Sequence, residues 1–218
     1  KIIAQGAFLN CSGVTSVTIP ASVVSIDDYA FKGCTGLQKI YFAGSVQSIG
    51  EYAFDGCTAL DNVVLPDSLT SIGRYAFNGC VGLTQIAFPD SLLEIGEYAF
   101  QSCTALAQLA LPDSLETIGN RAFYGCSGLH GGLVIPGAVE SIGEYAFYQC
   151  TGLDGKLVIE PGRKTIGSYA FYYCSKLSGL ELGDGITSIG SAAFYSCFGL
   201  TGDLIIPDSV TTIGSSAF

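Results

Sequence analysis

Residues 60–83 read LDNVVLPDSLTSIGRYAFNGCVGL, and residues 83–106 read LTQIAFPDSLLEIGEYAFQSCTAL. The two stretches share their apolar residues, a Pro-Asp-Ser turn, an Ile-Gly pair and an Ala-Phe-x-x-Cys block at the same positions. The pattern recurs along the whole chain, so its nine cysteines are 23 residues apart, or 24 in two cases. A fixed period of this length indicates one structural unit stacked on itself.

Each repeat predicts two short strands separated by a turn. Leu60, Val63 and Leu65 follow an L-x-x-L-x-L spacing whose second half alternates, which is the period of a strand. Pro66 fits the end of this strand because proline lacks the N–H that a ladder needs, and the Asp-Ser that follows is typical of a turn. A second extended segment, S-L-x-S-I-G, comes next.

The last part of each repeat, Y-A-F-x-x-C-x-x-L, predicts one helical or 3₁₀ turn on the other side of the coil. Phe77, Cys80 and Leu83 are spaced three residues apart, which suits a short helical turn with one buried face. The glycine before this block, for example Gly73, recurs in phase. A recurring glycine predicts a tight bend or a left-handed backbone position.

Stacking is needed because one repeat cannot bury its apolar residues alone, whereas nine stacked repeats form a continuous core. We therefore expect a curved solenoid, α/β or mainly β, that is one domain over residues 1–218, with a parallel sheet on its concave face. The sequence opens and closes inside a repeat and shows no polar cap. This predicts an excised part of a longer chain; the alternative is that the ends of neighbouring molecules stack on one another.

The consensus L-x-x-I-x-[LIF]-P-x-S-[LV]-x-x-I-G-x-x-A-F-x-x-C-x-x-L resembles the leucine-rich repeats of BspA-like bacterial surface proteins, and it covers essentially all of the sequence. The resemblance implies an arc with a parallel sheet along one face, and an extracellular or cell-surface location. It also implies adhesion, since some members of that family are implicated in binding host matrix proteins such as fibronectin and fibrinogen.

The composition argues against several functions. Nine Lys and Arg against 19 Asp and Glu give a net charge of −10, which disfavours nucleic acid and anionic membrane surfaces. No apolar run is long enough for direct membrane insertion. A Ser-His-Asp or Cys-His arrangement would have to use His130, the one histidine, which lies apart from any recurring nucleophile. We therefore predict that the protein is not an enzyme.

Nine cysteines at one phase predict reduced thiols in the core, because a free cysteine behaves as a small buried hydrophobe. Stacked coils would bring neighbouring cysteines close enough for a disulfide, and a metal site is a further alternative. The odd count and the repeat itself favour buried thiols. On this basis Cys80→Ser should destabilise the fold by a few kcal/mol, since it buries a hydroxyl that lacks a partner.

Three aspartates share one turn position in successive repeats, namely Asp67, Asp90 and Asp113. A ladder of carboxylates could attract calcium. The simpler interpretation is that aspartate after proline ties the turn through its side chain. The series is also broken by Gly44, Gly137 and Pro161. We therefore predict no metal and no cofactor.

The residue between the last two inward positions of the first strand should point outward, and we call this series the outer row. It reads Thr18, Tyr41, Val64, Ala87, Ala110, Val134, Val158, Glu181 and Ile205. Strand propensity alone explains small and β-branched residues here. The functional interpretation is a mildly apolar strip for a partner, with Tyr41 to Glu181 as candidate contacts.

A second candidate surface follows the repeated Phe in the C-terminal half, where four repeats carry tyrosine; we call it the tyrosine ridge: Tyr124, Tyr148, Tyr172 and Tyr195. Tyrosine is favoured at interfaces, although stacking for stability is the alternative. The leading functional hypothesis is non-enzymatic binding of a host or bacterial surface protein or glycan by a monomer. The rivals are a structural spacer, a self-associating repeat domain and, less favoured, an enzyme active on carbohydrate or peptide.

Overall fold

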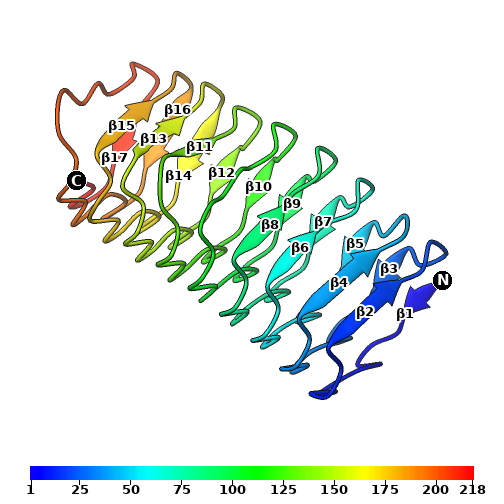
Figure 1. Cartoon of the computed structure of the whole chain (residues 1–218). Coiled ribbons are helices and arrows are strands. Elements are labelled where there is room, and N and C mark those ends of the chain that lie inside the picture. The colour runs from blue at the N-terminus through cyan, green and yellow to red at the C-terminus, as the bar shows by residue number, and fades with distance from the viewer.

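The computed structural model describes all of residues 1–218 and is a β-solenoid of about nine coils that runs from the N-terminus to the C-terminus (Figure 1). Each coil can contribute a first strand before the proline turn and a second strand after it. The first strands are β2 (Ser16–Ile19), β4 (Lys39–Phe42), β6 (Asn62–Val64), β8 (Gln85–Ala87), β11 (Leu133–Ile135), β13 (Lys156–Ile159) and β15 (Gly179–Leu182).

The second strands contain the Ile that precedes the repeated glycine. They are β1 (Ile2–Ile3), β3 (Ser25–Ile26), β5 (Ser48–Ile49), β7 (Ser71–Ile72), β9 (Glu94–Ile95), β10 (Thr117–Ile118), β12 (Ser141–Ile142), β14 (Lys164–Ile166), β16 (Ile186–Ile189) and β17 (Thr212–Ile213).

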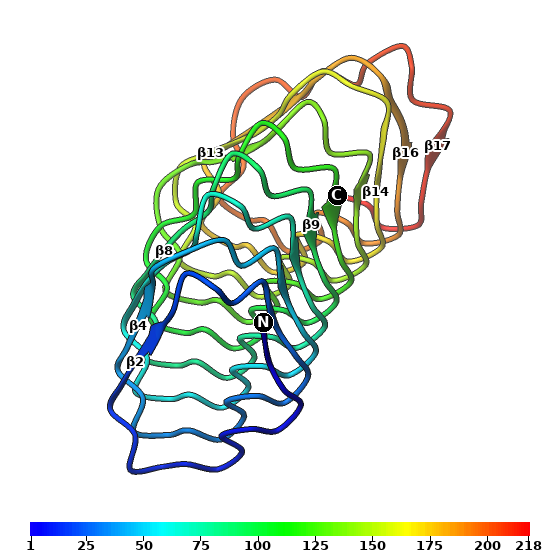
Figure 2. The same ribbon diagram turned by 90° about the vertical axis from the view of Figure 1, so that its right-hand side faces the viewer.

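All strand pairs are parallel, which confirms the predicted parallel sheets. The second strands form one ten-stranded sheet in chain order. The first strands form a four-stranded sheet, β2-β4-β6-β8, and a three-stranded sheet, β11-β13-β15, because residues 106–112 between them make no strand. Seen from the N-terminal end, the two kinds of strand lie along opposite sides of the coil (Figure 2).

One hydrophobic core of 56 buried residues fills the space between the strands. Its largest members are stacked phenylalanines, one from each coil, whose neighbouring ring centroids are 5.1 to 5.4 Å apart. This spacing follows from the separation of parallel chains, about 4.8 Å, because each ring occupies the same place in its coil. The repeat therefore predicted which residues form the core.

The predicted helical turn is wrong, because the Y-A-F-x-x-C segment forms turns and no helix. The N–H groups of Tyr52 and Phe54 donate to the carbonyls of Arg74 and Ala76 in the next coil, at 2.9 and 2.7 Å. The N–H of Cys57 instead bonds three residues back, to Phe54 at 3.1 Å. Since alternate N–H groups join neighbouring coils, they cannot continue a helix.

The repeated glycine is needed for close approach rather than for a left-handed conformation. Gly73 is not among the residues with positive φ, whereas Tyr75, two residues later, has a φ of 56°. A Cβ built on Gly73 would lie 2.7 Å from the carbonyl carbon of Gly50 in the preceding coil. The left-handed alternative for this glycine is thus wrong, and the tyrosine takes that conformation.

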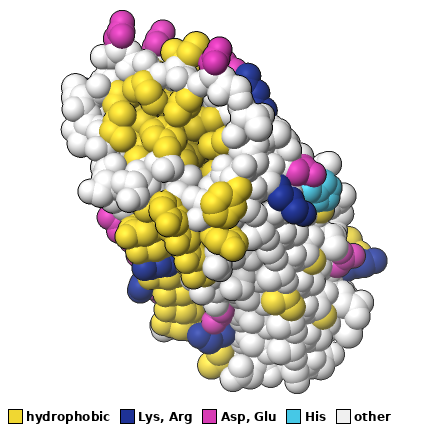
Figure 3. All heavy atoms as spheres, turned by 90° about the vertical axis from the view of Figure 1, so that its left-hand side faces the viewer, with side chains coloured by type: hydrophobic (Ala, Val, Ile, Leu, Met, Phe, Trp, Pro, Cys, Tyr) yellow, Lys and Arg dark blue, Asp and Glu magenta, His cyan; other side chains and the backbone are white.

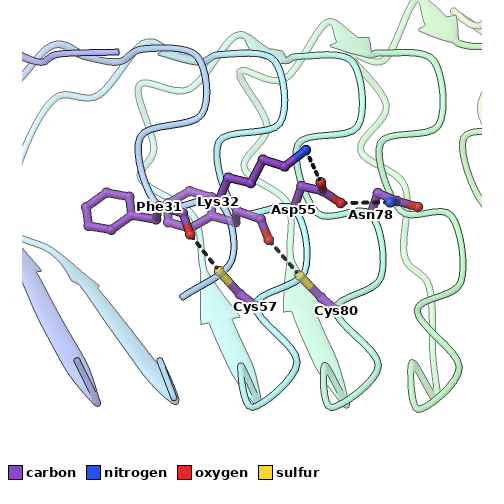
Figure 4. A network of polar contacts seen from close by, with 7 residues as sticks. Phe31, Lys32, Asp55, Cys57, Asn78 and Cys80 are labelled. Carbon is purple, nitrogen blue, oxygen red and sulfur yellow. Dashed lines mark hydrogen bonds and ion pairs between the residues drawn. The ribbon is translucent and has the colours of Figure 1, made fainter. Parts of the chain in front are cut away.

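The cysteine thiols are free, and all except Cys11 are buried, as the sequence predicted. Each buried thiol also has a partner that the sequence did not reveal. Cys57 Sγ donates to the carbonyl of Phe31, and Cys80 Sγ to that of Phe54, both at 3.2 Å (Figure 4). The same bond recurs from Cys34 to Cys197 at 3.0 to 3.2 Å, and so forms a thiol ladder.

This ladder lowers the expected effect of Cys80→Ser, because the serine hydroxyl inherits the carbonyl of Phe54 as an acceptor. We now expect a loss of about 1–2 kcal/mol in the free energy of unfolding, from lost apolar volume and a longer hydrogen bond. Urea denaturation at pH 7 measures it, with Cys80→Ala as the comparison that also removes the donor. A serine variant less stable than the alanine variant would show that the hydroxyl is not satisfied.

Candidate binding faces

The outer row points away from the core, as predicted from strand alternation. Tyr41, Val64 and Val134 are 54%, 66% and 48% exposed, whereas their inward neighbours Ile40 and Val63 are buried. Other members differ in detail. Ala87, Ala110 and Glu181 are exposed, and Val158 is half-buried.

Charge interrupts the C-terminal part of this row. Glu181 on β15 forms an ion pair with Lys156 on β13, which lies in the polar series beside the row. On the N-terminal side this polar series contains Lys39, which forms no ion pair, and Asn62 donates to Gln85 at 3.4 Å. The outer row itself carries no charge from Thr18 to Val158.

A groove of about 740 Å³ opens at the N-terminal end of the outer row, between β4 and β6. The strands β2 and β4 pair over four residues, but β4 and β6 pair only at Lys39 and Asn62. The groove occupies the region beyond that pair, and both Tyr41 and Val64 line it. Its other lining groups include Lys39, Asp61, Asn62 and Asp67. The repeat did not reveal this groove, since it arises from a local loss of pairing.

The tyrosine ridge is a stack of rings. The centroids from Tyr124 to Tyr148, Tyr172 and Tyr195 are 4.7, 5.0 and 5.3 Å apart in turn, with nearly parallel planes. Each inner ring is therefore covered on both faces and presents its edge and hydroxyl. The stacking matches the structural alternative, while binding by the ridge stays a prediction.

A second tyrosine series lies beside the ridge and widens this aromatic face. Tyr145 and Tyr169 are 5.6 and 5.7 Å from the ridge members Tyr148 and Tyr172. In this second series Arg121 takes the place of a tyrosine, and its guanidinium carbon lies 5.3 and 4.6 Å from the rings of Tyr98 and Tyr145. A cation between two aromatic faces is favourable. The arginine therefore links the rings on either side of it, and the series is not interrupted where a tyrosine is missing.

The C-terminal end of the solenoid exposes apolar side chains, which gather on the face shown in Figure 3. Phe198 and Ile205 are 76% and 77% exposed, and Phe198 lines a pocket of about 520 Å³ with Leu204 and Phe218. The rings of Phe194 and Phe218 stack at 5.4 Å, which continues the core ladder to the last residue. These side chains are exposed because no further coil covers them in the structure.

No group of three or more His, Cys, Asp or Glu side chains is placed to hold a metal ion. Asp67, Asp90 and Asp113 are exposed at the turn. His130 is also exposed, and its Nδ1 lies 3.1 Å from the carbonyl of Gly128. No helix of the structure has the length and hydrophobicity needed to span a membrane.

Lys164 is a buried charge that the sequence analysis missed. Its position in the repeat aligns with Glu140, but a bulge between Lys164 and Thr165 shifts the register and turns the lysine inward. Its Nζ donates to the carbonyl of Pro136 at 2.8 Å. Burial lowers the pKa of Lys164, while the nearby Glu160 carboxylate acts in the opposite direction. The displaced proline, Pro161, is the one signal that could have pointed to this shift.

Comparisons with known proteins agree with this architecture. The profile described as "BspA type Leucine rich repeat region (6 copies)" matches residues 1–130 and 130–218. A solved leucine-rich repeat protein of T. pallidum is 30% identical, with a TM-score of 0.66 over 85% of this chain and 83% of that chain. A search of curated protein sequences found no significant match.

Two further solved structures are similar. The pneumococcal vaccine antigen PcpA is 27% identical with a TM-score of 0.57, over 92% of this chain and 58% of that chain. A leucine-rich cell surface protein of Faecalibacterium prausnitzii is 25% identical with a TM-score of 0.51, over 100% of this chain and 74% of that chain.

Proposed function

We propose that this chain, which belongs to the BspA-type leucine-rich repeat family, is a non-enzymatic binding module of a bacterial cell-surface or secreted protein. Its partner would be a protein or glycan at a host or bacterial surface, and its activity would be adhesion. The solved relative whose name describes a cell surface protein supports the location.

The observation that carries the proposal is the outer row itself. Between Tyr41 and Val134 its side chains carry no charge, and three of them, on the strands β4, β6 and β11, are about half exposed or more. Contiguous exposed apolar surface is typical of interaction sites. Because the strands are held in register by the coils on either side, little conformational entropy is lost when a partner binds.

The test places charge on the outer row outside the groove. Ala110→Lys with Val134→Lys should weaken binding to immobilised fibronectin or fibrinogen at least tenfold, because a charged side chain in an apolar contact loses its water. Those two matrix proteins are the probes that the family resemblance suggests. Binding is measured by surface plasmon resonance.

The matched control carries the same two lysines at Thr58 and Thr104, which are exposed in turns after the cysteines. Its binding should equal that of the wild type, because the net charge is the same in both variants. Equal binding by both double variants would move the site away from the outer row. If the wild type binds neither protein, the spacer hypothesis is favoured.

A further inference from the structure

Tyr41 differs from every other tyrosine in the chain. Of the twelve tyrosines, eleven have their rings packed against another aromatic ring. Tyr41 has no such neighbour and no cation over its ring, and it is 54% exposed on β4. Its aromatic face is therefore open to solvent on a rigid strand, where a ligand can stack on it.

The groove beside Tyr41 has the size of a small-molecule site. Its volume of about 740 Å³ falls within the range of roughly 300–1,000 Å³ typical of ligand pockets. Val64 and Pro66 contribute apolar surface to its lining. The groove therefore places an open aromatic ring beside a hollow that can hold more than one ring of a ligand.

The polar groups of the groove offer both donors and acceptors. Lys39 and Asp67 are exposed and form no ion pair, and Asn62 supplies an amide. Asp61 accepts the hydroxyl of Thr84 at 2.6 Å through Oδ1, which leaves its second oxygen available. A carboxylate accepts, an ammonium donates and an amide does both, so this set suits neighbouring hydroxyl groups, each of which also does both.

Charge selects among possible ligands. The groove has two carboxylates and one ammonium, and the chain has a net charge of −10, so an anionic ligand is repelled. An apolar ligand would cover Lys39 and Asp67, which form no ion pair, without giving either a partner. A neutral saccharide meets both conditions. In β-linked gluco-configured sugars the hydroxyls are equatorial, so the ring hydrogens form an apolar face that stacks on an aromatic ring.

We propose that the groove between β4 and β6 binds a neutral β-linked oligosaccharide of gluco configuration, with one sugar ring stacked on Tyr41 and its hydroxyls bonded to Asp61, Asn62 and Asp67. This site deepens the proposed binding function, and rests on it, because Tyr41 and Val64 belong to the outer row. It assigns a glycan to the N-terminal end of that row.

Saturation-transfer NMR with cellotriose and chitotriose tests the site, with trigalacturonate as the acidic comparison. The wild type should give transfer to at least one neutral trisaccharide and none to the acid. Tyr41→Leu keeps apolar bulk without a ring and should weaken binding about tenfold, whereas Tyr41→Phe should stay within about threefold. Tyr173→Leu is the matched control and should bind like the wild type, because Tyr173 is 43% exposed but its ring lies against that of Tyr172, with the centroids 6.2 Å apart.

Several results would overturn the site. These are no transfer to either neutral trisaccharide, stronger transfer to the acid, and equal binding by Tyr41→Leu and the wild type. Loss of binding in Tyr41→Phe would equally reject ring stacking. The matrix-protein binding of Ala110→Lys with Val134→Lys is measured separately and lies outside the groove. The sugar site can therefore fail while the proposed protein contact holds, and the reverse.

Discussion

Raising the pH from 8 to 10.5 is expected to unfold this protein under fully reducing conditions. Burial raises the pKa of Cys57, Cys126 and Cys197 from the ordinary value of 9.0 to about 12, and it raises the other five buried thiols as well. In the unfolded chain these thiols ionise near pH 9, whereas in the folded chain they keep their protons. The stability they contribute is therefore complete below pH 9 and is lost as the pH rises toward 12.

The size of the effect decides the outcome. Each thiol removes about 1.4 kcal/mol of stability per pH unit within this window, so eight thiols remove on the order of 10 kcal/mol per unit, comparable with the whole stability of a typical domain. Burial lowers the pKa of Lys164, so the contribution of this lysine to the stability of the fold increases as the pH rises. This is one group, however, and it opposes eight thiols. Tyr75 and Tyr148, whose pKa values are raised by burial, act in the same direction as the thiols.

Urea denaturation at pH 8, 9 and 10, with a phosphine reductant, measures this slope. The double variant Cys80→Ala with Cys103→Ala retains six buried thiols, and its loss of stability per pH unit should be about a quarter smaller than in the wild type. A free energy of unfolding that stays constant up to pH 10.5 would contradict the buried, protonated thiol ladder.

Gly96→Ala is expected to lower the free energy of unfolding by about 3 kcal/mol or more. A Cβ on Gly96 would lie 2.8 Å from the carbonyl oxygen of Ile72 and 2.9 Å from the carbonyl carbon of Gly73. Both atoms belong to the backbone of the preceding coil, so no side chain can move aside. The two coils must move apart, which weakens the hydrogen bonds between them and the packing of the core beneath.

Gly79→Asn is the matched control in the same part of the solenoid. Gly79 has a φ of +66°, and the nearest atom to an added Cβ is 4.0 Å away. Asn10 occupies the equivalent position with a φ of 58°, so the change should lower stability by less than about 1 kcal/mol. Thermal and urea denaturation compare the two variants. Equal loss in both would contradict close contact between coils as the reason for the repeated glycine.

The period predicted the coil, the parallel strands, the buried phenylalanines and the buried cysteines, because all of these repeat whenever equivalent residues occupy equivalent places. It failed at the Y-A-F-x-x-C segment. Apolar spacing of three suits a helical turn as well as a turn bonded to the next coil, and only the inter-coil hydrogen bonds of Tyr52 and Phe54 distinguish the two. The same spacing could not reveal the acceptor of each thiol.

Departures from the repeat were decided by the tertiary structure alone. The inward turn of Lys164 depends on a one-residue shift in pairing, and the groove at Tyr41 depends on the separation of β4 and β6 beyond Lys39. The sequence by itself determined which residues stack, since burial in a solenoid follows the period. It did not determine where neighbouring coils part, because that depends on the packing of two coils against each other, which no single repeat encodes.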